Sequence, residues 1–350
     1  MDASTHASES ASTSLSFAEA LAPPCRECHA LCCSYLPLQV VPVRTLMEAD
    51  YVRFLLGFPL LRAGFAVNGQ WSIYYAAPCR HFDPNARRCR VHGTWEQPRT
   101  CVAYNEHDCW YQRAISPDSK GFLLFDRARF ERLLALMAFD RERNIVSVPS
   151  WSEMVDLCAA LPLPLLPEEG PSADEAPPPE ATDAQPRQVA MADLMGDPCE
   201  GCSAPCCRYL YFPLAAPLAF MQVGYIRFCL NFPGLDCAVS PTSWWLLLRA
   251  DCRFLQAGSN RCSVYGTPER PLRCTHLNQW DCGQYRQLVS GDSGGLFRMG
   301  RDAFGLIAEQ MRFDGNGRIV YLPAELAPVG GRAGQEQAET RQSTGSHPSS

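Results

Sequence analysis

The feature that most constrains this chain is a cysteine-rich segment that occurs twice. Its first copy has the spacing C-x2-C-x3-C-C and comprises Cys25, Cys28, Cys32 and Cys33. Its second copy has the same spacing and comprises Cys199, Cys202, Cys206 and Cys207. Four later cysteines also recur, and the distance between their two copies is one residue shorter than for the opening segment. Cys79, Cys89, Cys101 and Cys109 thus reappear as Cys252, Cys262, Cys274 and Cys282. Self-similarity on this scale predicts two copies of one folding unit.

The repeat extends beyond the cysteines to aromatic residues. Tyr51 and Trp71 of the first copy correspond to Tyr225 and Trp244 of the second. These matches delimit two units and the segments around them. We expect a disordered N-terminal tail at 1–20, a first module at 21–155, a linker at 156–193, a second module at 194–327 and a disordered C-terminal tail at 328–350.

The expected linker is rich in proline, glutamate and alanine, and it includes three consecutive prolines at 177–179. A segment of this composition cannot bury enough apolar surface to offset its ordering entropy, so it stays extended and mobile. We therefore expect the two modules to be uncoupled and to bind ligands independently.

Hydrophobic periodicity predicts secondary structure within each copy. Apolar residues at helical spacing predict helices at 44–56, 130–139 and 220–230. Trp71, Ile73 and Tyr75 occupy alternate positions and predict a strand with these three side chains on one face, and 145–148 predicts a short strand. The predicted fold class is α+β, with two tandem small cysteine-rich metal-binding modules and substantial irregular loop.

Three uses for so many cysteines are open. Buried structural thiols are common, but they do not fall into adjacent pairs with duplicated spacing. A disulfide scaffold suits small secreted domains, whereas these modules are large enough to fold without cross-links, and a bond between adjacent Cys32 and Cys33 would form a strained ring. Metal ligation fits best, because C-x2-C lets two thiolates of one turn reach one metal.

All sixteen duplicated cysteines are therefore candidate metal ligands, whereas Cys158, Cys229 and Cys237 have no counterpart and are expected to be ordinary small buried residues. The spacing matches neither common ferredoxin pattern, and all-sulfur ligation suits zinc, Cu(I) and iron–sulfur clusters alike. We favour an iron–sulfur cluster over zinc as the cofactor, because no histidine of the first copy recurs in the second.

The opening run, followed by a C-x-V-Y segment and an R-P-x-x-C segment, resembles the CxxCxxCC cysteine-cluster family of zinc- or iron-chelating proteins (YkgJ-type). The second copy carries these segments in full, at 262–265 and 270–274. The first copy departs from them, because His92 replaces the tyrosine and Gln97 replaces the arginine. The resemblance implies a cytoplasmic bacterial protein that chelates zinc or an iron–sulfur cluster, and it extends to flagellin lysine methylases, which carry a similar cysteine motif.

Sequence motifs for nucleotide binding, serine hydrolysis and zinc proteolysis do not occur. We therefore expect a metal-binding protein with a redox-accessory or structural role, and assign no catalytic residue. The alternative is a modifying enzyme, such as a lysine methylase-like transferase, whose cysteine centre supports a separate active site.

The charge and hydropathy of the chain limit its other partners. A net charge of −6 argues against nucleic acid and anionic membranes as partners. The chain also lacks the 18 or so consecutive apolar residues of a membrane-spanning helix. Since residues 1–20 have neither a basic start nor an apolar core, they do not resemble a signal peptide. We therefore expect a cytoplasmic location and metal ions as the main partners.

Overall fold

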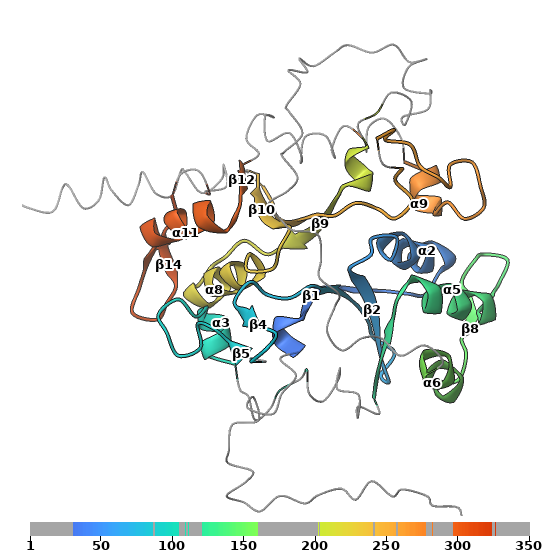
Figure 1. Ribbon diagram of the computed structural model, residues 1–350, viewed down its shortest axis with the longest axis horizontal. Coiled ribbons are helices and arrows are strands. Elements are labelled where there is room, and N and C mark those ends of the chain that lie inside the picture. Colours follow the sequence, from blue (N-terminus) through green and yellow to red (C-terminus); the bar gives the residue numbers. More distant parts are fainter. Residues whose placement is uncertain are drawn as a thin grey trace, which may run out of the picture.

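The computed structural model describes residues 31–104 (except 87), 109, 111, 121–159, 202, 204–277 (except 241 and 257), 282, 297–323 and 326. Its fold is mixed α+β, as the sequence predicts, and its elements occur in two matching series (Figure 1). We call residues 31–159 the first half and residues 202–326 the second half.

The first half contains the 3₁₀ helix η2 (Leu31–Cys33), β1 (Tyr35–Val41), α2 (Leu46–Leu55), β2 (Leu61–Ala66), β3 (Trp71–Ala76), β4 (Phe82–Asp83), β5 (Arg88–Cys89), α3 (Arg99–Val102), β6 (Phe122–Phe125), α5 (Arg127–Leu136), β7 (Ala138–Phe139), β8 (Ile145–Ser147) and α6 (Trp151–Ala159). The second half contains the 3₁₀ helix η4 (Pro205–Cys207), β9 (Tyr209–Leu214), α8 (Phe220–Cys229), β10 (Leu235–Val239), β11 (Trp244–Arg249), α9 (Leu272–Thr275), β12 (Phe297–Met299), α11 (Arg301–Gln310), β13 (Arg312–Phe313) and β14 (Ile319–Tyr321).

Each half is built on a four-stranded antiparallel sheet. The strand order is β1-β3-β2-β6 in the first half and β9-β11-β10-β12 in the second, which is the same order when the strands are matched along the chain. In the first sheet Val41 pairs with Trp71 across β1 and β3, and in the second Leu214 pairs with Trp244 across β9 and β11. The two sheets therefore share both topology and register at their repeated tryptophans.

Helix α2 shows how local sequence sets an element's ends. Thr45 caps its N-terminus by accepting a hydrogen bond from the Glu48 backbone, and the Glu48 carboxylate accepts one from the Thr45 N–H in return. Val52 and Leu55 then point into the core. This element and α8 confirm the helices expected at 44–56 and 220–230.

The helix expected at 130–139 is displaced. Asp126 accepts a hydrogen bond from the Arg129 N–H and so starts α5 at Arg127. Met137 has extended backbone angles that end the helix, and the next two residues form strand β7, which pairs with β8. The predicted strand at 145–148 is confirmed as β8, whereas the last residues of the predicted helix are wrong because strand pairing there replaces helical bonds.

Strand β3 has the predicted alternation, and both of its faces are covered. Trp71, Ile73 and Tyr75 point into the main hydrophobic core, where Trp71 packs against the rings of Phe65, Phe125 and Phe130. Its other face carries Tyr74 and Ala76, which pack into a second, smaller cluster. The strand is therefore a buried central strand rather than a half-exposed one.

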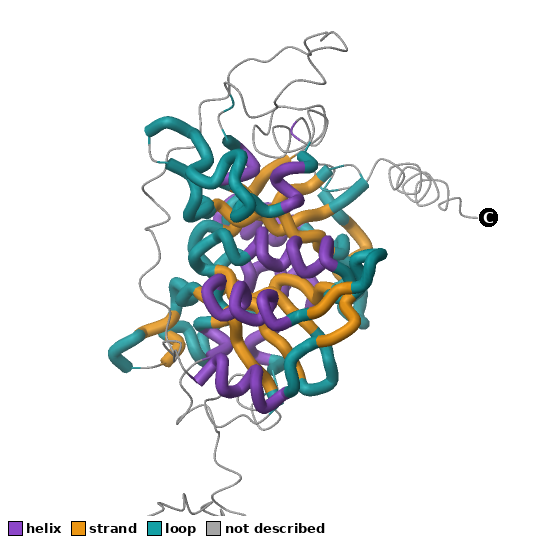
Figure 2. Tube along the Cα trace, turned by 90° about the vertical axis from the view of Figure 1, so that its right-hand side faces the viewer, coloured by secondary structure: helices purple, strands orange, loops and turns teal. Residues whose placement is uncertain are grey.

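The two halves pack together around one core, and this contradicts the expectation that they are uncoupled. Figure 1 shows α2 of the first half beside α9 of the second, and α8 of the second half beside α3 of the first. Figure 2 shows the described helices, strands and loops as one continuous body. Tyr75 donates a hydrogen bond to the carbonyl of Pro233 (2.7 Å), and Tyr225 donates one to Pro37 (3.4 Å). The halves are coupled because apolar helix faces on the modules themselves bury each other.

The predicted tails at 1–20 and 328–350 lie outside the described residues, as does the linker from residue 160 onward. Helix α6 continues to Ala159, four residues beyond the predicted end of the first module. Its Met154 is buried in the main core. No helix within the described ranges combines the length and apolar character needed to cross a bilayer.

Candidate metal centre

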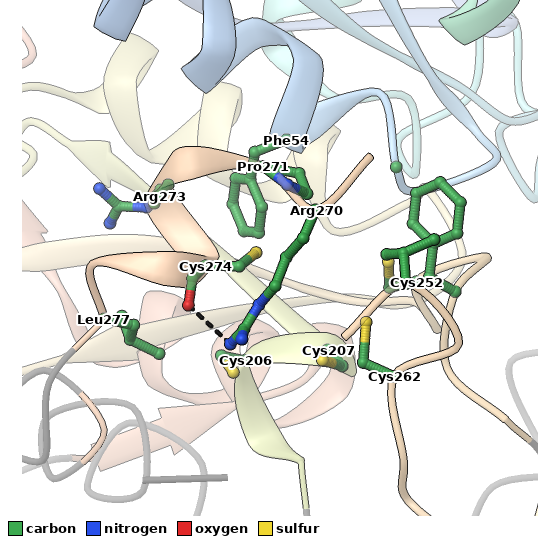
Figure 3. Close-up of a pocket in the computed structure, with 13 residues that line it drawn as sticks. Phe54, Cys206, Cys207, Cys252, Cys262, Arg270, Pro271, Arg273, Cys274 and Leu277 are labelled. Carbon is green, nitrogen blue, oxygen red and sulfur yellow. Dashed lines mark hydrogen bonds between the residues drawn. The ribbon is translucent and has the colours of Figure 1, made fainter. Parts of the chain in front are cut away.

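Five cysteines of the second half surround one small cavity. Its volume is about 50 Å³, and its cysteines are Cys206, Cys207, Cys252, Cys262 and Cys274. Phe254, Val264, Pro271 and Leu277 give the cavity apolar walls. Figure 3 shows Cys206 and Cys274 on one side, Cys207, Cys252 and Cys262 on the other, and the Arg270 side chain reaching between them.

Three backbone features bring these cysteines together. Ala204 has a left-handed conformation (φ 57°) that turns the chain into η4, which carries Cys206 and Cys207. The Cys252 N–H donates to the Cys207 carbonyl (2.7 Å), and this bond joins the end of β11 to η4. Pro271 then starts α9, which carries Cys274. Distant parts of the sequence thus meet through main-chain geometry rather than through the thiols themselves.

The first half brings together the corresponding cysteines. Burial is the main cause that raises the pKa of Cys101 to about 12, and the charges of Cys32, Cys79, Cys89 and Cys229 contribute to the same shift. Burial likewise raises the pKa of Cys274 to about 12, with added effects of Cys206, Cys252 and Cys262. We call these the first quartet (Cys32, Cys79, Cys89 and Cys101) and the second quartet (Cys206, Cys252, Cys262 and Cys274). Counterpart cysteines therefore interact electrostatically in both halves.

Backbone amides donate hydrogen bonds to several of these sulfurs. The N–H of His81 donates to Cys79 and the N–H of Phe254 donates to the counterpart Cys252, which lowers both thiol pKa values against the effect of burial. Cys89 receives similar bonds from the backbone N–H groups of Val91 and His92. A bond from an amide to sulfur favours the thiolate over the thiol, and such bonds tune metal–thiolate centres.

Burial keeps most of these thiols protonated near neutral pH. It raises the pKa of Cys79 to about 11, and raises those of Cys89 and Cys252 as well. The adjacent pair behaves differently, because the Cys33 thiol is hydrogen-bonded to Cys32, which lowers the pKa of Cys32 and raises that of Cys33. Binding of a metal at either quartet would have to displace protons.

The surroundings of the two quartets differ at matched positions. His81 stands where the second half has Phe254, and its side chain is hydrogen-bonded to that of Asn231. Gln97 stands where the second half has Arg270. The Gln97 side-chain oxygen accepts a hydrogen bond from the Gly93 N–H (2.7 Å), and this bond closes the loop that follows Cys89.

Arg270 brings a positive charge into the second site. Its guanidinium donates to the Cys274 carbonyl (2.8 Å) and lies over the ring of Tyr265, with its central carbon 4.1 Å from the ring centroid. This charge favours the Cys274 thiolate and lowers its pKa against the effect of burial. The second site therefore holds a cation beside its sulfurs where the first holds a neutral amide.

Among the remaining predicted ligands, Cys207 lines the same cavity as the second quartet, and Cys33 is hydrogen-bonded to Cys32 of the first. The other predicted ligands belong to neither quartet or lie outside the described residues. Cys109 packs in the smaller cluster with Tyr74 and Tyr111, and the Tyr104 hydroxyl contacts its sulfur at 3.7 Å. Cys282 is buried, and Cys202 accepts a hydrogen bond from the Ala204 N–H (3.3 Å). Predicted ligands outside the described residues are Cys25, Cys28 and Cys199.

The three unmatched cysteines are not part of either quartet. Cys229 and Cys237 are fully buried in the main core, which confirms their expected role. Cys158 is half-buried on α6, with its sulfur 3.7 Å from the Leu124 carbonyl. All described cysteines are free thiols.

The donor chemistry suits a soft metal, although the sulfurs have not converged. Within the described residues, no three side chains of His, Cys, Asp or Glu are arranged to hold one metal ion. The second quartet nevertheless lines a single cavity and includes a sulfur that receives an amide hydrogen bond. Thiolates are the ligands that zinc, Cu(I) and iron–sulfur clusters prefer. The residues therefore fit such a group by the type of their donor atoms.

Sequence reasoning missed the residues that the other half contributes. Phe54 and Gly57, at the C-terminal end of α2, line the cavity of the second quartet. Figure 3 shows Phe54 beside Pro271. A side-chain carbon placed on Gly57 would lie 3.5 Å from the Cys252 sulfur. The repeated aromatic residues of α2 and α8 were a signal that these helices bury a face, but sequence alone does not say against what.

A second, more open hollow adjoins this cavity. Its volume is about 480 Å³, and Arg273 and Leu277 line both spaces. The hollow also exposes polar groups of Gln39, Tyr51 and His276. The guanidinium of Arg273 lies over the Tyr51 ring, 5.3 Å from its centroid.

Comparisons with known proteins give no relative for this chain. A scan of family models, a search of curated proteins and a search of solved structures each found no match. The resemblance to the cysteine-cluster family therefore rests on the cysteine motif alone.

Proposed function

We propose that this chain is a metal-binding protein with two cysteine-ligated centres, one for each quartet, carried by tandem modules at about 21–155 and 194–327. The observation that carries the proposal is that the same cysteines recur in the same main-chain arrangement, since the N–H groups of Cys79 and Cys252 donate to the carbonyls of Cys33 and Cys207 (both 2.7 Å). In the second half these cysteines surround one cavity. Buried, non-ligating thiols would have no reason to keep both the spacing and these donors.

In this proposal, different groups of the site have different roles. The quartets supply thiolate ligands, and the amide N–H groups stabilise negative charge on sulfur. The apolar walls around the second quartet exclude water, which strengthens every charge interaction inside. An iron–sulfur cluster would supply one-electron transfer, whereas zinc would supply only structural cross-linking. We favour the cluster because no histidine recurs beside the cysteines of both halves, and a redox-accessory role follows from it.

Anaerobic purification followed by metal and acid-labile sulfide analysis tests the proposal. Wild-type protein should carry iron with sulfide and absorb visible light, or carry zinc without colour. The double variant Cys79→Ser/Cys252→Ser should lose most of this metal, because each substitution removes a ligand from one quartet. Cys158→Ser is the matched control and should retain it. Wild-type protein that takes up neither iron–sulfur cluster nor zinc would refute the proposal.

The modifying enzyme remains a second candidate, and the open hollow beside the second quartet favours it. Arg273 and His276 lie three residues apart on this hollow, whereas the matched positions of the first half are Thr100 and Ala103. A separate site for an anionic substrate group would use these two side chains. In that case inorganic phosphate should shift the His276 imidazole NMR signals, and Arg273→Gln should abolish the shift without changing the metal content.

A further inference from the structure

We propose that each quartet is completed by the opposite half of the chain, and that metal binding at the two quartets is therefore cooperative. The proposal rests on the two-centre function above and adds a coupling between the centres. We call residues 54–57 the α2 lid and residues 228–231 the α8 lid. The α2 lid closes the second quartet, and the α8 lid closes the first.

The α2 lid is seated directly on the second quartet. Phe54 and Gly57 line the cavity that the cysteines surround. The Gly57 carbonyl accepts a hydrogen bond from the Arg253 N–H (2.9 Å), which comes immediately after Cys252. Glycine at position 57 also leaves this side of the cavity open, because a side-chain carbon there would lie 3.5 Å from the Cys252 sulfur.

The α8 lid makes the matching contacts with the first quartet. The Asn231 carbonyl accepts a hydrogen bond from the Arg80 N–H (2.9 Å), which comes immediately after Cys79. The Asn231 side chain is hydrogen-bonded to that of His81. Cys229, the last residue of α8, is buried in the core cluster against which Cys101 packs.

Matching contacts between the halves continue along α2 and α8. The N–H of Arg273, in the short helix that carries Cys274, lies 3.4 Å from an Asp50 carboxylate oxygen on α2. At the matched contact, a side-chain carbon on Gly224 of α8 would lie 3.5 Å from the Thr100 nitrogen, next to Cys101. Each short cysteine-bearing helix is thus supported by the long helix of the other half.

Cooperativity follows from this arrangement. Metal binding at one quartet orders the segments around its cysteines, and those segments hold the lid that belongs to the other half. The ordered lid is continuous with the helix and strands of its own half, so the second metal encounters a site whose ordering cost is partly met. By linkage, each metal then raises the affinity for the other by the same factor.

The test uses full-length protein with one quartet disabled at a time. Cys252→Ser/Cys274→Ser leaves the first quartet as the only complete one, and Cys79→Ser/Cys101→Ser leaves the second. Zinc affinity is measured in each by competition with a chromophoric chelator. Both single-site proteins should bind zinc about fivefold or more weakly than the same site in wild-type protein, which is the low end of usual coupling.

The decisive variant is Gly57→Asn, which gives the α2 lid the residue found at the same place in the α8 lid. The same turn carries a side chain in the α8 lid, where Asn231 makes the bond to Phe228 (3.1 Å) that Gly57 makes to Phe54 (2.9 Å). A side-chain carbon on Gly57 would lie 2.9 Å from the Phe54 carbonyl oxygen, so the α2 turn has to shift slightly to accept it. The added side-chain carbon would lie 3.5 Å from the Cys252 sulfur, so zinc affinity of the second quartet should fall about tenfold. The first quartet lies in the same half as the substitution. Its zinc affinity, measured in the Cys252→Ser/Cys274→Ser protein that lacks the coupling, should change less than about twofold. The control Gly305→Asn has no atom within 4 Å of the new side-chain carbon and should change neither.

Several results would overturn the proposal. Gly57→Asn that weakens the first quartet instead, or neither quartet, would show that the lids do not act across the halves. Equal zinc affinity of each site in single-site and wild-type protein would remove the coupling. If wild-type protein binds no metal, the proposed function fails, and alkylation of Cys252 by iodoacetamide then tests the lid alone. Alkylation slowed by Gly57→Asn and unchanged by Gly305→Asn supports the crossed lid, and equal rates in both refute it.

Discussion

The two cysteine sites have the same ligands in different surroundings. At three matched positions the first site has His81, Gln97 and Asn231, and the second has Phe254, Arg270 and Gly57. The quartets and the amide donors to Cys79 and Cys252 are common to both. The comparison teaches that the shared chemistry resides in sulfur and main chain, whereas side chains nearby adjust polarity and charge at each site separately.

The largest expected effect tests whether the halves are one folding unit. Trp71→Ala should cost about 3–5 kcal/mol, because it leaves a cavity among three aromatic rings in the shared core. Trp244→Ala should destabilise the chain to a similar extent, because Trp244 is buried in the same core at the matched position. Urea unfolding should show one transition that either substitution shifts. Two transitions, of which each substitution shifts only one, would separate the halves.

The next prediction concerns Cys229, whose counterpart in α2 is Leu55 and cannot titrate. Burial raises the pKa of Cys229 from 9.0 to about 12. Its protonated form is therefore favoured by folding, and this stabilisation is complete below pH 9 and is lost as pH rises from 9 to 12. The loss should be about 1.4 kcal/mol per pH unit. Urea titrations of metal-free protein should show a shallower alkaline decline for Cys229→Ala, and parallel profiles would contradict the assignment.

The smallest expected effect sharpens the electrostatic difference between the sites. Arg270→Gln gives the second site the residue of the first and removes the cation beside the Cys274 thiolate. Zinc affinity of the second quartet should fall about tenfold, which corresponds to one pKa unit of thiolate stabilisation. Arg270→Lys should recover part of the loss because it restores the charge. Chelator competition in the protein that retains only the second quartet measures both, and equal affinities for all three would make the arginine structural.

Much of the fold was predictable because its signals are local. The capping box at Thr45 and Glu48 and the alternation around Ile73 act within a few residues, so α2 and β3 lie where the sequence predicts them. The end of α5 was predicted wrongly because Met137 and Phe139 continue the helical spacing of apolar residues, yet strand pairing with Ile145 determines their structure.

The candidate site was predictable only in its cysteines. Duplicated spacing identifies the thiols, but it does not separate the quartet members from Cys109, which lies in a different cluster. The contributions of Gly57 and Asn231 come from the opposite half, and no pattern within one copy specifies a contact across the chain. For the same reason the composition of the linker was a poor guide to coupling, since coupling depends on which faces of the modules meet.

The reciprocal packing of α2 with α9 and of α8 with α3 has a consequence for how such a chain can change. In a symmetric dimer of identical subunits, every substitution at the interface occurs in both subunits and therefore changes both of the equivalent contacts. Here both sides of the interface belong to one chain, so the matched positions are free to diverge. Asp50 faces the Arg273 amide at one contact while Gly224 faces Thr100 at the other. Joining the two copies thus allows one pair of contacts to preserve the assembly while the other acquires new chemistry.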